Sequence, residues 1–310
     1  LLTTPAAFRK RYRNDAVAFA HDCIDWRGAK PTPYQDELWA NITAKRRCCI
    51  RSPHGAGKTM AAATVVLWFA LTRDVDVDWK VAITASAWRQ LSLYLLPEIH
   101  KWSRRLRWDK IHRSAFTPTE LMLNSLRLST GEAFAVASSD AAFIEGAHAS
   151  EMMYIFDESK AVPPAIFDAA EGAFSTGEAY ALAISTPGES AGRFYDIQSR
   201  KHGYEDWWVR HWTLEECTAA GRITPKWVSD RKRQWGEQSP IFQNRVLGDF
   251  ATGQSSGLIP LTWVEDANLR WHERNLACEG RWADPIDAIG IDCAWTGEDK
   301  SALAPRRGNA

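Results

Sequence analysis

The feature that most constrains the fold is the stretch Arg51–Thr59, which has the sequence Arg-Ser-Pro-His-Gly-Ala-Gly-Lys-Thr. It follows a short apolar run, Cys48–Ile50, and precedes an apolar segment rich in helix formers, Met60–Leu71. A strand that leads through a glycine-bearing loop into a helix with Lys-Thr at its start is typical of a phosphate-binding loop. The stretch therefore predicts an α/β fold, in which helices flank both faces of a mostly parallel sheet and the site lies beyond the carboxyl ends of the strands.

The predicted loop has the chemistry to bind ATP and Mg²⁺. Glycines let backbone N–H groups turn inward around phosphate oxygens, and the helix N-terminus adds unpaired N–H groups and partial positive charge. We expect Lys58 to bind the β- and γ-phosphates and the Thr59 hydroxyl to bind Mg²⁺. Ser52 stands where the first glycine of the usual pattern is expected. The predicted loop ligands are Ser52, Pro53, His54, Gly55, Ala56, Gly57, Lys58 and Thr59.

A second stretch, Met152–Phe156, is an apolar run that ends in two acids, Asp157 and Glu158. Such a run predicts a central strand that delivers carboxylates to the edge of the sheet where the phosphate loop lies. Asp157 is predicted to hold Mg²⁺, directly or through water together with Thr59. Glu158 is predicted to orient and deprotonate the water that attacks the γ-phosphate.

Two further stretches complete the predicted nucleotide site. Ser185, Thr186 and Pro187 follow the buried strand predicted over Ala179–Ile184, so their hydroxyls can sense the γ-phosphate and the turn can pass the signal on. Before the loop, Tyr34 and Gln35 begin a helix after two prolines. A glutamine amide matches the two-sided edge of adenine and an aromatic ring can stack on it; the alternative is that Tyr34 and Leu38 simply pack the helix.

Composition limits the remaining possibilities. The 310 residues, 45% of them apolar and 25% charged, are typical of a globular protein with one large or two modest domains. The formal net charge is zero, so DNA contacts must come from local basic clusters. The six cysteines have no metal-binding spacing, which favours reduced thiols in the cytosol. We expect no membrane association, because the apolar run Ala61–Leu71 is too short to span a bilayer and no signal peptide is found.

The order of these motifs resembles the large terminase subunit of tailed bacteriophages. Three shorter stretches add to the resemblance: Gly146–His148, Gly192–Tyr195 and Arg245–Phe250. The segment Gly290–Asp292, followed by Gly297–Ser301, resembles the first strand of that family's nuclease domain. The resemblance extends from about residue 30 to the end of the chain.

The resemblance implies an ATP-driven packaging motor. Copies of such a subunit form a homo-oligomeric ring on the portal protein of a procapsid and pump double-stranded DNA inward, whatever its sequence. A small terminase subunit is a further expected partner, and the expected location is the host cytoplasm rather than the mature virion. The same motif match gives Lys58, Thr59, Asp157 and Glu158 the roles described above and makes Ser185–Pro187 the coupling motif.

The resemblance also divides the chain. It implies an ATPase domain over residues 1–250 with a small helical lid at about 205–250, a linker over 251–285, and the start of a ribonuclease-H-like domain over 286–310. Asp292 would be the first metal ligand of the nuclease. A two-metal nuclease needs several converging carboxylates, so we expect DNA cleavage only from a complete protein.

The cation that stabilises the transition state is left open by the sequence. The family often carries an arginine shortly before the Asp-Glu strand, but Phe143–His148 contains none. Arg51 could act within its own subunit, and Arg104, Arg105 or Arg107 could act on a neighbour across the ring.

Two other functions use the same motifs. A helicase or recombinase-type ATPase would share the phosphate loop and the acids, but would not need a nuclease-like strand around Asp292. A packaging scaffold with a degenerate site is a non-enzymatic alternative, suggested by Ser52 and opposed by the intact Lys58-Thr59 and Asp157-Glu158 pairs.

Overall fold

A computed structural model of the chain describes residues 4–85, 91–137, 144–175, 178–251, 261–277, 285–292 and 302–306. The chain divides into two compact units, Leu1–Ala251 and Thr252–Ala310.

The first unit is organised around a seven-stranded sheet with the order β3-β4-β2-β5-β6-β1-β7. Every pairing is parallel except β3 with β4, which form an antiparallel hairpin. The strands are β1 (Arg47–Arg51), β2 (Trp79–Ala85), β3 (Ser125–Arg127), β4 (Gly131–Ala137), β5 (Glu151–Asp157), β6 (Ala179–Ser185) and β7 (Trp208–His211). The expected fold class, a mostly parallel sheet flanked by helices, is confirmed.

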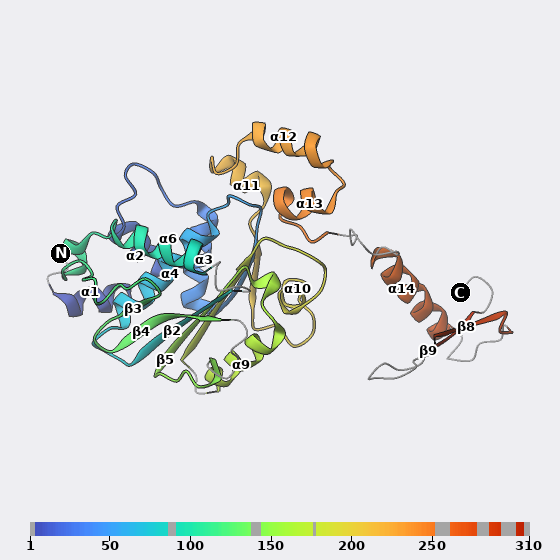
Figure 1. The fold of residues 1–310 in the computed structure, drawn as a ribbon, viewed down its shortest axis with the longest axis horizontal. Helices are drawn as coiled ribbons and strands as arrows, with labels where there is room; N and C mark the ends of the chain where they lie inside the picture. Colours follow the sequence, from blue (N-terminus) through green and yellow to red (C-terminus); the bar gives the residue numbers. More distant parts are fainter. Residues whose placement is uncertain are drawn as a thin grey trace. The chain divides into compact units, whose positions relative to one another are not determined.

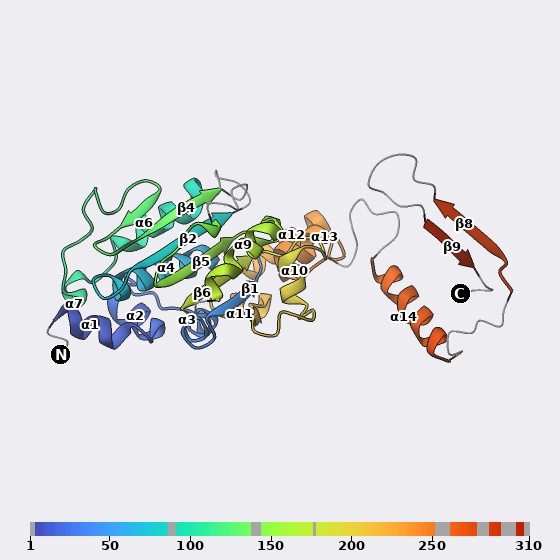
Figure 2. The ribbon, with the colours of Figure 1, turned by 90° about the horizontal axis from the view of Figure 1, so that it is seen from below.

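Helices cover both faces of this sheet, and two separate cores result (Figures 1 and 2). One face carries α1 (Pro5–Tyr12), α2 (Ala16–Cys23), α3 (Pro33–Lys45), α4 (Lys58–Arg73), α6 (Leu96–Ser103) and α7 (Trp108–Ile111), and the other carries α9 (Pro164–Phe174) and α10 (Arg193–Gln198). Side chains alternate across each strand. Met153 and Ile155 of β5 therefore join the α4 core, while Tyr154 and Phe156 join the α9 core. Helix α4 is buried on all sides, because other helices cover the stripe that the sheet leaves free.

Short helices follow β7 and lie beyond the strand ends in Figure 1: α11 (Leu214–Ala219), α12 (Pro225–Trp235) and α13 (Pro240–Phe242), which continues as a π-turn over Gln243–Leu247. Since β7 pairs with β1 inside the sheet, the helical part of the predicted lid starts at Leu214 rather than near residue 205. We call residues 214–249 the lid.

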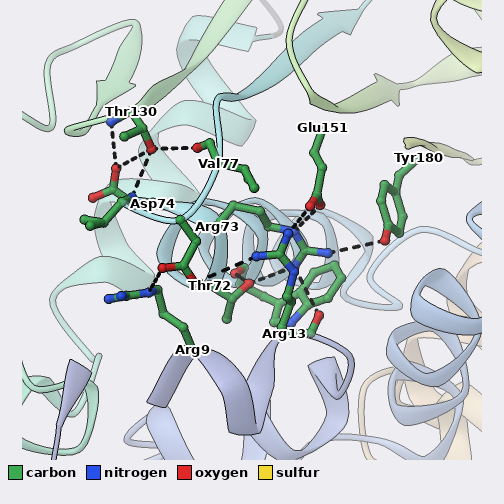
Figure 3. Close-up of polar contacts among 12 residues, drawn as sticks. Arg9, Arg13, Thr72, Arg73, Asp74, Val77, Thr130, Glu151 and Tyr180 are labelled. Carbon is green, nitrogen blue, oxygen red and sulfur yellow. Dashed lines mark hydrogen bonds and ion pairs between the residues drawn. The ribbon is translucent and has the colours of Figure 1, made fainter. Parts of the chain in front are cut away.

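A charged cluster ties α1 and α4 to the start of β5 and β6 (Figure 3). The Arg73 guanidinium is 1% exposed; its Nε donates to Glu151 at 3.0 Å and it also reaches the Tyr180 hydroxyl at 3.4 Å. Arg13 binds the other oxygen of Glu151, and its carbonyl accepts a hydrogen bond from Arg73. The ring of Trp68 lies 4.3 Å from the guanidinium carbon, so the charge is both paired and stacked.

The second unit contains a helix where a connector was expected. Helix α14 spans Leu261–Ala277, inside the predicted linker 251–285. The glycines, serines and proline that suggested a linker fall between Gly253 and Pro260, whereas α14 has none of them. The predicted strand exists as β8 (Ala288–Asp292), which pairs antiparallel with β9 (Ala302–Arg306). The stretch Gly297–Ser301, which contributes to the resemblance, lies outside the described residues.

Within the described ranges no helix has both the length and the apolar character needed to cross a bilayer.

Candidate functional site

The loop between β1 and α4 has the backbone of a phosphate cradle. Gly55 and Gly57 have φ of +82° and +90°, in the left-handed region that glycine enters freely. Gly57 is the N-cap of α4, so the first helical residues are Lys58 and Thr59. Ser52 is not among the residues with positive φ, which explains why a serine is compatible with this position.

The Lys58 ammonium is held at the centre of the loop. It donates to the Ser52 hydroxyl at 3.1 Å, to the Pro53 carbonyl at 2.9 Å and to the Thr186 hydroxyl at 2.8 Å. Burial lowers the pKa of Lys58 to about 8, and the nearby carboxylates of Glu158 and Asp157 act in the opposite direction. The three hydrogen-bond partners of the ammonium are neutral oxygens, which phosphate oxygens can replace.

The two acids stand at the end of β5, as predicted, but in different surroundings. Asp157 is 5% exposed, and its burial, reinforced by the charge of Glu158, raises its pKa to about 7. Glu158 has φ of +46° and ψ of +45°, a conformation that costs a non-glycine residue about 1–3 kcal/mol. This turn brings its carboxylate to Ser185, whose hydroxyl donates to it at 3.1 Å.

The Ser185-Thr186 pair joins the loop to the acids. Strand β6 lies between β1 and β5, so its carboxyl end is adjacent to both. Ser185 donates to Glu158, and Thr186 accepts from Lys58. Both side chains are fully buried, and Pro187 after them is buried too. The predicted coupling residues thus contact the predicted lysine and the predicted catalytic acid.

A cavity of about 730 Å³ opens beside this cluster. Its wall includes the predicted residues His54, Gly55, Gly57, Lys58, Thr59, Glu158 and Thr186. Residues that the sequence did not assign to the nucleotide also line it, among them Tyr94, Glu98, Lys101 and Arg222. Lys101 is paired with Glu98 at 2.8 Å.

Oxygen donors suitable for Mg²⁺ are present in this cluster. Mg²⁺ prefers carboxylate and hydroxyl oxygens and usually completes its shell with phosphate and water. Thr59 supplies the hydroxyl and Asp157 a buried carboxyl group. No group of three or more His, Cys, Asp or Glu side chains is placed to hold a metal in the described ranges.

Tyr34 and Gln35 are used differently from the adenine-binding prediction. Gln35 is fully buried; its side-chain oxygen accepts from the Thr32 N–H at 3.0 Å and its amide donates to the Gly57 carbonyl at 3.4 Å. Tyr34 is 2% exposed and donates to the Ala56 carbonyl at 3.0 Å. Neither residue lines the cavity. A Thr-x-x-Gln sequence at a helix start is the capping pattern, and this signal favours the packing alternative.

Arg51 also lies elsewhere than predicted. Side chains alternate across β1, so Arg51 lies on the same face of the sheet as Cys49, whose core includes residues of α10. This face is opposite to the one that packs against α4. Its guanidinium contacts Gln198 at 3.3 Å, His211 at 3.3 Å and Asp249 at 3.4 Å. As placed, Arg51 therefore braces β1 against α10 and the end of the lid and does not line the cavity.

The lid contacts the phosphate loop directly at its end. Gly248, with φ of +73°, is so close to the loop that a Cβ atom there would lie 2.7 Å from the Pro53 nitrogen. The His54 N–H donates to the Arg245 carbonyl at 2.9 Å. Burial, together with the positive charges of Lys58 and Arg245, lowers the pKa of His54 to about 4, so the imidazole is neutral at pH 7.

Asp292 is the last residue of β8, in the second unit, where Ala302 is its strand partner.

Comparison with known proteins gives a curated relative and several solved structures. No protein-family model matches the chain. The probable large terminase subunit of Enterobacteria phage P7 is 23% identical over 326 residues, which cover 94% of this chain and 58% of that protein. The chain thus spans less than two thirds of the relative's length.

Two solved structures establish the fold. The ATPase domain of the Thermus phage P74-26 large terminase matches with a TM-score of 0.56 and 18% identity, over 72% of this chain and 95% of that one. The large terminase of a thermophilic bacteriophage, solved in complex with ADP, matches with a TM-score of 0.51 and 12% identity, over 94% and 64%. The resemblance to phage large terminase subunits is confirmed, and the first unit has the fold of their ATPase domain.

Proposed function

We propose that this chain is the ATP-hydrolysing part of a motor that packages double-stranded DNA into a phage procapsid. The observation that carries the proposal is that Lys58, at the start of α4, and Glu158, directly after β5, line one cavity and are joined through Thr186 and Ser185. The similarity to phage terminases, one of them solved with ADP, supports it.

The chemistry follows from the geometry of these residues. Lys58 exchanges its present oxygen partners for the β- and γ-phosphates of ATP. Mg²⁺ held by Thr59 and Asp157 would neutralise the charge that develops on the phosphate oxygens. Glu158 accepts a proton from the water that attacks the γ-phosphorus, while the bond to the ADP oxygen breaks. Ser185 fixes the orientation of that carboxylate.

The same contacts suggest how hydrolysis is coupled to movement. Ser185 and Thr186 contact the acid and the lysine whose environments change when the γ-phosphate leaves. The turn at Pro187 and Gly188 is connected to the lid, because Asn244 donates to the Gly188 carbonyl at 3.0 Å. A change at the γ-phosphate can therefore reach the lid, and through it bound DNA, provided that the ATP and ADP states differ in these contacts.

The partners are inferred from the similarity. We expect sequence-independent DNA binding, a homo-oligomeric ring on the portal protein of the procapsid, and a small terminase subunit; the place of action would be the host cytoplasm. Asp292 would belong to a ribonuclease-H-like nuclease. A helicase or recombinase-type ATPase remains the alternative, and binding to portal or procapsid separates the two.

Glu158→Gln tests the assignment of the catalytic acid. The amide cannot accept the proton, so we expect ATP binding to persist while turnover falls by about 10²-fold or more. Glu189→Gln is the matched control, since Glu189 is exposed, and should hydrolyse ATP as the unaltered chain does. Retained hydrolysis in Glu158→Gln would remove this residue from its role, and absence of hydrolysis in the unaltered chain, with and without DNA, would favour the scaffold alternative.

A further inference from the structure

We propose that Arg222, in the lid, binds the phosphates of the nucleotide within its own chain. This inference rests on the proposed function and adds to it the arginine that the sequence left open. Arg51 was the intrachain candidate, but its guanidinium contacts Gln198, His211 and Asp249 outside the cavity. Arg222 is an arginine of the described residues that does line the cavity, together with Lys58, Thr59 and Glu158.

The backbone around Arg222 is held against the phosphate loop. A Cβ atom on Gly55 would lie 3.8 Å from the Ile223 side chain and 4.0 Å from the Arg222 carbonyl, so the lid turn lies beside the middle of the loop, at a distance that one methyl group would bridge. Ile223 is 5% exposed and belongs to the α4 core. Because Ile223 is packed in this core, the Cα atom of the adjacent Arg222 is held in place next to the loop.

The turn itself is closed by hydrogen bonds to the end of α11. The N–H groups of Arg222 and Ile223 donate to the Cys217 carbonyl at 2.9 and 3.3 Å, and Gly221 has the φ of +69° that this turn requires. Cys217 is fully buried. The guanidinium is therefore carried by a rigid turn, which reduces the entropy lost when it binds a ligand.

The guanidinium itself has no partner within the described part of the chain. The Arg222 side chain is exposed and makes no hydrogen bond or ion pair there. Two other long cations that line the cavity are already occupied, Lys101 by Glu98 and Lys58 by three oxygens. A guanidinium presents paired N–H donors that match phosphate oxygens. A polyphosphate is the ligand class that this charge and this position fit.

The test is equilibrium binding of imido-linked, non-hydrolysable ATP and GTP analogues to the full chain by calorimetry. Loss of charge-assisted hydrogen bonds should weaken binding of both analogues in Arg222→Ala by a similar factor, about 10-fold or more. Arg222→Lys keeps the charge and should recover part of the loss. Arg233→Ala is the matched control, because Arg233 is an exposed lid arginine that pairs with Asp230 and does not line the cavity.

Each other result overturns the assignment. Unchanged affinity in Arg222→Ala removes Arg222 from the site, and a loss confined to the ATP analogue would show that it contacts the base instead. An equal loss in Arg233→Ala would show a general effect of lid charge. If the unaltered chain binds neither analogue, the proposed function fails first, and this inference with it. The melting temperature without nucleotide should not change in Arg222→Ala, because the side chain is exposed.

Discussion

At the scale of single residues, the site keeps two opposite charges away from water. Burial raises the pKa of Asp157 to about 7 and lowers that of Lys58 to about 8, so each shift disfavours the charged form. A ligand of opposite charge therefore favours the charged form of each group. A divalent cation favours the Asp157 carboxylate, and phosphate favours the Lys58 ammonium. Such groups cost stability in the empty protein and contribute affinity when the ligand arrives.

The Asp157 carboxyl predicts a particular pH dependence of stability. Folded protein keeps this proton up to about pH 7, whereas unfolded chain loses it near the ordinary value of 3.8, so the folded state binds more protons between these values. Its contribution to stability must fall as pH rises through that window. Asp157→Asn cannot ionise, so its stability relative to the unaltered chain should rise from pH 4 to pH 7 by up to about 1.4 kcal/mol per pH unit.

Urea denaturation in EDTA without nucleotide measures this difference. His54, with its pKa lowered to about 4, titrates in the opposite direction, but it does so in both proteins and largely cancels. A stability difference that stays constant from pH 4 to pH 7 would contradict a buried, protonated Asp157.

At the scale of elements, α3 supports the phosphate loop through its first turn. Gln35 closes that turn at the Thr32 N–H and reaches the Gly57 carbonyl, while the Tyr34 ring packs on Trp212 with centroids 4.7 Å apart. The helix thus joins the loop to the segment between β7 and the lid. A residue pair that was expected to select the base instead holds the backbone that binds the phosphates.

Gln35→Ala separates the two roles. It removes one helix cap and one contact with the loop, so we expect a loss of about 1 kcal/mol in the free energy of unfolding and an unchanged preference for ATP over GTP. Asn41→Ala, which removes an exposed side-chain hydrogen bond to Glu37 in the same helix, should cost less. Unchanged stability with a lost preference for ATP would restore the adenine-binding prediction.

At the scale of the whole first unit, the site and its support lie at opposite ends of the strands. The nucleotide residues stand at the carboxyl ends, and the Arg73–Glu151 cluster stands at the start of β5 and the end of α4 (Figure 3). The same helix that begins at Lys58 ends at Arg73. The cluster therefore fixes α4 against β5, the strand that carries Asp157.

Arg73→Met tests this support. It leaves the Glu151 carboxylate, whose side chain is 8% exposed, with Arg13 alone, and removal of one partner from a buried ion pair typically costs about 3–5 kcal/mol. Arg11→Met removes an exposed pair with Asp15 and should cost about 1 kcal/mol at most. Denaturant unfolding measures the free energy of unfolding of both single variants. Glu151→Gln in the Arg73→Met background should restore part of the loss; equal stability of the two single variants would rule out a supporting role.

The sequence predicted what depends on local pattern. The loop, the acid-bearing strand and the parallel sheet follow from short runs of apolar, glycine and acidic residues. Side-chain alternation along β1 already points Arg51 away from α4, and Thr32 with Gln35 already forms a capping pattern, so these two differences were accessible. The position of Arg222 at the cavity could not be predicted from the sequence, because the approach of the lid turn to Gly55 is a tertiary contact without a local signal.

The contact at Gly248 has a consequence for the phosphate loop itself. A Cβ atom at this position would lie 2.7 Å from the Pro53 nitrogen and 2.8 Å from the Ser52 carbonyl carbon, so only glycine lets the end of the lid pass this close to the loop. Any side chain introduced at Gly248 would have to displace either the end of the lid or the backbone of Ser52 and Pro53. A single methyl group at a position that does not line the cavity would thereby disturb the cradle that holds Lys58.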